Sequence, residues 1–170
     1  MKSALALALL VASTMPAFAG CDLEPIEAAL GASTAGLKQL DRDVSDVQST
    51  EGGVWQIFRE KDGRVHTIIR IDAGESGRNE TRLGIVNRKN YGIAATRIDY
   101  LRHAFAEDAG PNATVRRTTD FYFYCDGKLY LPPEGYSMID AAAYRTTGES
   151  LQKIMILDKD VADFTKGLAR

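Results

Sequence analysis

The feature that most constrains the fold is a series of short, apolar-rich segments separated by tight turns between residues 52 and 131. Glycine stands in the turns at 61–63, 74–77 and 126–127. Connections this short join strands that lie side by side and run in opposite directions. The sequence therefore predicts an antiparallel meander of about six strands. Their expected ranges are 54–59, 64–71, 81–86, 91–100, 120–125 and 128–131.

Before the meander, residues 22–48 carry apolar or small side chains at alternating intervals of four and three. That spacing is typical of one helix face, so we expect a single long helix with Asp22 as N-cap and Pro25 in its first turn. Gly31 and Gly36 each lower its intrinsic stability by about 1 kcal/mol, so packing must hold it. Such a helix either lies across the sheet or forms the seam of a coiled-coil dimer.

The segment after Pro132-Pro133 predicts a helical C-terminus. Residues 138–144 form a short helix or an extended lead-in, and Thr146 with Glu149 fits a capping box. Apolar side chains then recur at helical spacing to the end of the chain. The expected fold class is α+β: an N-terminal helix, the meander and a C-terminal helix, with the helices packed on one face of the sheet.

The first 19 residues have the three parts of a secretory signal peptide. Lys2 precedes an apolar stretch at 4–12, and Ala17-Phe18-Ala19 provides a small-residue cleavage site before Gly20. The apolar stretch is shorter than the roughly 20 residues that a membrane-spanning helix needs. We therefore expect export to the periplasm, removal of residues 1–19, a single domain at 20–170 and no transmembrane segment.

The chain has two cysteines, Cys21 and Cys125. An even count in an oxidising compartment predicts a disulfide, which here would close a loop of about 100 residues. Phe18-Ala19-Gly20-Cys21 also resembles a bacterial lipoprotein cleavage site, after which Cys21 would carry lipid. The sequence leaves both states open: a disulfide-bonded domain or a membrane-anchored lipoprotein.

Charge and residue types exclude two classes of function. Lys and Arg number 21 against 23 Asp and Glu, and no basic run exceeds a pair such as Arg116-Arg117. A nucleic-acid-binding surface therefore has no electrostatic basis here. His66 and His103, with the two cysteines, do not show the spacing of metal ligands. We expect neither a metal centre nor a cofactor.

Catalytic motifs are weak. Residues 74–77 are similar to a nucleophile elbow, but Arg78 replaces the final glycine and no helix is expected to follow, so we interpret them as a turn. Asp72, Glu75 and Glu80 cluster around that turn. Acid–base catalysis would need two of these carboxylates in one cleft with their pKa values pushed apart. A hydrolase using them with an arginine is one alternative function.

Aromatic residues alternate along 121–124, a segment that ends in Cys125. We expect Phe121 and Phe123 to join Cys125 in the core, so that the intervening tyrosines face the other way. Tyrosine and arginine are favoured at contact surfaces, so this second face would suit a protein partner or a small anionic ligand. A helix covering it would bury it instead. The candidate binding face contains Tyr122, Tyr124, Tyr130, Arg70 and Arg97.

Several turn residues and tyrosines carry a resemblance to known proteins. The turn residues and tyrosines that carry it are Ser49-Thr50-Glu51-Gly52-Gly53, Asp62-Gly63, Gly74-Glu75-Ser76-Gly77-Arg78, Tyr91 and Tyr100. Over residues 45–102 the chain resembles small exported bacterial proteins of unknown function, which implies periplasmic residence but no activity and no site residues.

The expected function is a non-enzymatic periplasmic binding or protein-interaction module, one form of which is an inhibitor of an envelope hydrolase. The alternatives are the hydrolase described above and a lipid-anchored envelope assembly factor attached through Cys21.

Overall fold

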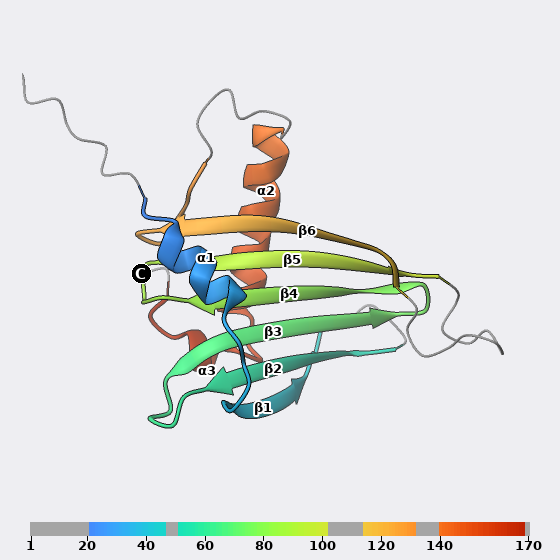
Figure 1. Cartoon of the computed structure of the whole chain (residues 1–170), viewed down its shortest axis with the longest axis horizontal. Coiled ribbons are helices and arrows are strands. Elements are labelled where there is room, and N and C mark those ends of the chain that lie inside the picture. The colour runs from blue at the N-terminus through green and yellow to red at the C-terminus, as the bar shows by residue number, and fades with distance from the viewer. Residues whose placement is uncertain (1–20, 47–50, 102–113, 132–139, 169–170) are drawn as a thin grey trace, which may run out of the picture.

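The computed structural model describes residues 21–46, 51–101, 114–131 and 140–168. Its centre is a seven-stranded antiparallel sheet in which each strand pairs with its neighbours in sequence (Figure 1). The expected meander and the α+β class are confirmed. The expected signal peptide at 1–19 lies outside the described residues. The strands are β1 (Lys38–Asp43), β2 (Gly53–Arg59), β3 (Val65–Gly74), β4 (Gly77–Ile85), β5 (Tyr91–Tyr100), β6 (Thr114–Cys125) and β7 (Lys128–Leu129).

The long helix expected at 22–48 is wrong in its second half. Helix α1 covers only Glu24–Gly31, and Gly36, with a φ of +79°, turns the chain into β1. A spacing of four, as between Leu40 and Val44, places two residues on the same side of a strand as well as of a helix. The periodicity therefore could not separate the two structures.

Strands β4 and β6 begin earlier than the apolar pattern indicated. Gly77 pairs directly with Gly74, so the hairpin loop between β3 and β4 is only two residues long. Residues 114–119, expected to be mostly loop, extend β6 along the second half of β5. Thr119 and Thr96 face each other there with their hydroxyl oxygens 2.9 Å apart. Polar cross-strand pairs of this kind stabilise a sheet without apolar side chains.

The C-terminal segment forms helix α2 (Ala141–Gln152), a π-helical turn η1 (Lys153–Leu157) and the short helix α3 (Ala162–Thr165). The helix begins before the expected capping box, because the side chain of Asp140 accepts hydrogen bonds from the backbone N–H groups of Ala142 and Ala143. Thr146 lies inside α2 and donates to the carbonyl of Ala142 instead.

The helices cover both faces of the sheet, not one face as expected. Figure 1 shows α1 in front of the sheet and α2 behind it. We name the face that carries α2, η1 and α3 the core face, and the opposite face the α1 face. Each helix is too short to cover the long strands completely.

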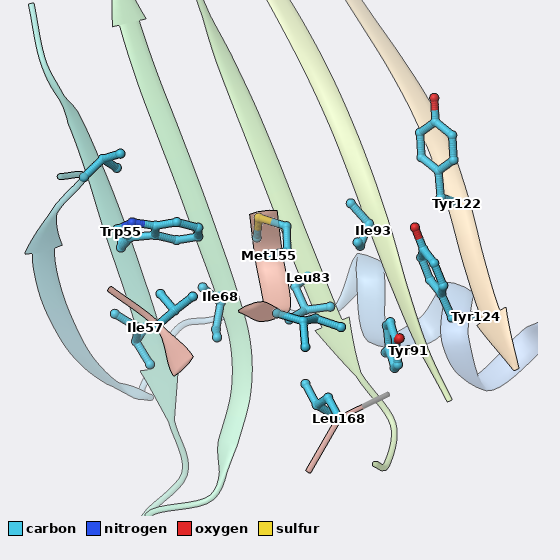
Figure 2. Close-up of a cluster of buried hydrophobic side chains, with 13 residues drawn as sticks. Trp55, Ile57, Ile68, Leu83, Tyr91, Ile93, Tyr122, Tyr124, Met155 and Leu168 are labelled. Atoms are coloured by element: carbon cyan, nitrogen blue, oxygen red, sulfur yellow. The ribbon is translucent and has the colours of Figure 1, made fainter. Parts of the chain in front are cut away.

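The main core lies between the sheet and the C-terminal helices. One row of paired residues crosses five strands of the core face, and Met155, Val161 and Leu168 pack against this layer. All of them are at most 8% exposed. Figure 2 shows these side chains gathered on one side of the strands, opposite to α1. The row consists of Ile57, Ile68, Leu83, Ile93 and Tyr122.

A disulfide joins Cys21 to Cys125, with the Cα atoms 6.0 Å apart. It attaches the start of α1 to the end of β6. Since the sulfur of Cys21 is bonded to Cys125, it has no free valence for a lipid chain. Within the described ranges, no helix is long and apolar enough to cross a membrane.

Candidate functional site

The tyrosines of the candidate binding face belong to the core. Tyr122 is 5% exposed and Tyr124 is fully buried beneath α2. The hydroxyl of Tyr124 donates a 2.7 Å hydrogen bond to the carbonyl of Gly148. Burial raises the pKa of the Tyr124 phenol and of the Tyr122 phenol. The helix that could cover this face does cover it, so neither side chain is presented to a ligand. Tyr130 is half-buried after β7.

Phe121 and Phe123 were expected in the core and instead lie on the α1 face. Phe121 is 49% exposed, and Phe123 is half-buried. Side chains along β6 alternate as expected, but the tyrosines face the main core and the phenylalanines face the other side. The main core is on the tyrosine side, because α2 packs there and its backbone accepts a hydrogen bond from a buried phenol.

Arg70 and Arg97 lie on the core face beyond the end of α2, in a polar trough. Arg70 binds both oxygens of Asp72 and lies 3.9 Å from Asp158. Arg97 and Arg116 each donate from Nε to one oxygen of Asp99, at 2.9 and 3.1 Å. Carboxylates on the same face therefore already balance these guanidinium groups.

The carboxylates of the hydrolase hypothesis do not converge. Asp72 pairs with Asn79 across the β3–β4 ladder, whereas Glu80 pairs with Ile71. Directly paired residues share a face, so the side chains of Asp72 and Glu80 lie on opposite faces of the sheet. Glu75 is exposed in the hairpin loop. These three residues therefore form no common cleft.

Among the described residues, no group of three or more His, Cys, Asp or Glu side chains is arranged to hold a metal ion. The Nδ1 of His66 lies 2.9 Å from the hydroxyl of Thr67. His103 lies outside the described residues.

A groove on the α1 face has a lining that suits a ligand better than the buried tyrosines or the paired arginines of the core face do. It exists because α1 sits directly on the backbone of β4 and β5. A Cβ added at Gly84 would lie 2.7 Å from the backbone of Ala29, and one at Gly92 would lie 2.7 Å from the side chain of Leu30. The eight-residue helix covers this row of the sheet and leaves the next row partly covered, with Ala94 7% exposed and Phe121 49% exposed. The step between helix and sheet is the wall of the groove.

The groove has a volume of about 630 Å³. Its floor follows one row of paired residues that crosses β3 to β6, from Ile69 through Arg82 and Ala94 to Phe121. Leu30 and Gly31 of α1 form one side. The other side is more polar and contains Glu80, Thr96, Arg117 and Thr119. The apolar floor is thus interrupted by one guanidinium.

Arg82 is half-buried, and among the described residues it forms no ion pair. One terminal nitrogen donates to the carbonyl of Ala32, directly after α1. Its Nε is buried and has no hydrogen-bond partner in the described part of the chain. Burial lowers the pKa of this guanidinium. Burying part of a charge without a counter-charge is unfavourable, so the groove is electrostatically incomplete by itself.

The sequence contains a signal that could have located this groove. Gly84 and Gly92 interrupt two apolar strands, and glycine inside a strand often marks close approach of another backbone. The position of α1 and the row of the sheet that lies beside it depend on the three-dimensional register, which local patterns do not contain.

Comparisons with protein-family models, with curated proteins and with solved structures find no match. The resemblance to small exported bacterial proteins stays an expectation from the sequence.

Proposed function

We propose that this protein is an exported, periplasmic binding protein that holds a small amphipathic ligand in the groove beside α1. The proposal is carried by the composition of the groove. A concave site of about 630 Å³ with an apolar floor and a few polar groups has the size and lining of a small-molecule site. The disulfide between Cys21 and Cys125 supports residence in an oxidising compartment.

A non-enzymatic role is supported by the separation of the carboxylates. The sheet lies between Asp72 and Glu80, so they cannot act as an acid–base pair on one substrate. The paired charges of the trough on the core face also favour the α1 groove as the binding site, because carboxylates already occupy those arginines.

The experiment is a titration with N-phenyl-1-naphthylamine, an uncharged fluorophore whose emission rises in apolar sites. We expect saturable binding to the intact protein. Phe121→Ala removes the exposed aromatic ring at the end of the groove floor and should weaken binding about tenfold through lost apolar contact.

The matched control is Leu157→Ala, which removes another exposed apolar side chain, 69% exposed, from the opposite side of the sheet. This variant should bind the fluorophore as the parent protein does. No saturable binding, or equal weakening by both substitutions, would overturn the groove as the ligand site.

A further inference from the structure

We infer that the ligand of the α1 groove is an anionic amphiphile: one anionic group, such as a carboxylate, that contacts Arg82, and an apolar chain that lies over Ala94 toward Phe121. This inference rests on the proposed binding function and names the chemical class of the ligand. Its basis is the charge distribution around the groove floor.

Glu80 is the nearest carboxylate along the strand, two residues before Arg82 on the same face. It does not balance Arg82, because it is shared by two other arginines. Arg78 donates from Nε to one of its oxygens at 2.7 Å, and Arg117 lies 3.6 Å from the other. Arg82 is left with a backbone carbonyl, which carries no formal charge.

Glu27 of α1 also lines the groove, but its side chain is exposed. The lining of the groove contains two arginines, Arg82 and Arg117, and two glutamates, Glu27 and Glu80, so the charge left without a partner is local to Arg82. A ligand with one negative charge would pair with the guanidinium of Arg82. Hydrogen bonds between a guanidinium and a carboxylate are among the strongest available to such a ligand.

The order of residues along the floor determines the second part of the ligand. Arg82 on β4, Ala94 on β5 and Phe121 on β6 are consecutive partners in one row. Two strand spacings separate Arg82 from Phe121, a distance of about 10 Å. An apolar chain that starts at the guanidinium would therefore cross the small Ala94 and reach the exposed phenyl ring.

Arg82 also has a structural role that the test must separate from binding. Its bond to the carbonyl of Ala32 places a cation at the C-terminal end of α1, which is favourable for a helix. Loss of that contact would reduce stability whether or not a ligand binds. A readout that depends on the charge of the ligand distinguishes the two roles.

The experiment compares decanoate, 1-decanol and decyltrimethylammonium on the intact protein below their micelle concentrations, by calorimetry. The three share an apolar chain and differ in charge. We expect decanoate to bind about tenfold more tightly than decanol, and the cation to bind most weakly. Arg82→Gln should remove this preference while keeping the binding of N-phenyl-1-naphthylamine, and Arg82→Lys should keep part of it.

The matched control is Arg145→Gln, which removes an exposed arginine from α2 on the other side of the sheet. It should leave the preference for decanoate unchanged. Equal binding of decanoate and decanol, together with saturable fluorophore binding, would overturn the anionic class and leave the groove intact as a site. Absence of binding by all four compounds would overturn both proposals. If folded Arg82→Gln protein still binds decanoate more tightly than decanol, Arg82 stabilises the end of α1 and does not contact the ligand.

Discussion

At the scale of the residue, Tyr122 and Tyr124 place polar hydroxyl groups inside the main core. They are buried because a helix backbone carbonyl, that of Gly148, is within reach of one hydroxyl. Two tyrosine pairs stack in this layer with ring centroids 4.8 Å apart, Tyr91 with Tyr124 and Tyr122 with Tyr144.

The buried phenols predict a loss of stability in alkali. Burial raises the pKa of Tyr91, Tyr122 and Tyr124 above the ordinary value, and it raises the pKa of Tyr144 to about 12. Above about pH 10 the unfolded chain loses phenol protons that the folded chain keeps. The native state then binds more protons, so the free energy of unfolding is unaffected by these groups below pH 10 and falls above it.

Urea unfolding at steps from about pH 9 to about pH 11.5 measures this fall, with tyrosinate absorbance followed in parallel. Tyr144→Phe removes one of the shifted phenols and should make the decline shallower. A midpoint that stays constant over this range, or a decline that is equally steep in Tyr144→Phe, would contradict the account.

At the scale of the element, turns were more informative than apolar spacing. Glycine in the turns at 61–63, 74–77 and 126–127 correctly predicted that the strands on either side of each turn are neighbours. The expected range of 91–100 also matches the bounds of β5. The expectation of one helix over 22–48 was wrong because a spacing of four residues fits a helix and a strand equally well. Gly36, at positive φ, turns the chain into β1. Arg42 then secures β1 through a 2.8 Å bond to the carbonyl of Asp160 and a contact with the ring of Phe164. Neither partner is close in sequence, so local patterns could not show it.

The close contact between α1 and the sheet predicts that two glycine substitutions change the free energy of unfolding by different amounts. In Gly84→Ala the added methyl meets the backbone of α1 at 2.7 Å, so the helix must move and the free energy of unfolding should fall by about 1–3 kcal/mol. In Gly31→Ala nothing lies within 4 Å of the added methyl, and the helix end should be unchanged or slightly more stable. Urea denaturation of both variants measures the difference; equal midpoints would contradict the close contact.

At the scale of the whole molecule, the disulfide between Cys21 and Cys125 links the groove to the covalent structure of the chain. It holds the start of α1 against the end of β6, and α1 is one wall of the groove. The sequence predicted the pairing from the cysteine count. It could not predict that the bridge fixes a groove wall, because the row of the sheet beside α1 is defined only in the folded register.

Removing the bridge should therefore affect both stability and binding. The double variant Cys21→Ala with Cys125→Ala removes a covalent link between residues 104 positions apart, so its unfolded chain gains conformational entropy. On the chain-entropy model its free energy of unfolding should fall by about 4–5 kcal/mol. Binding of decanoate should weaken as well, because α1 loses its covalent attachment. Unfolding of the parent protein with and without a reductant gives an independent comparison. Equal stability in both states would show that the bridge does not constrain the chain.

Methyl-detected NMR during a titration with decanoate would show whether the ligand binds on the α1 face. A side-chain methyl group lies on one face of the sheet and reports binding there, whereas a backbone amide lies within the sheet and can respond to binding on either face. Binding in the groove should shift the methyl signals of Leu30, Ile69 and Ala94 on the α1 face and leave those of Ile68, Leu83 and Ile93 in the main core little changed. Shifts at Leu151 and Ile154 in the trough of the core face, with the groove methyls unmoved, would contradict it.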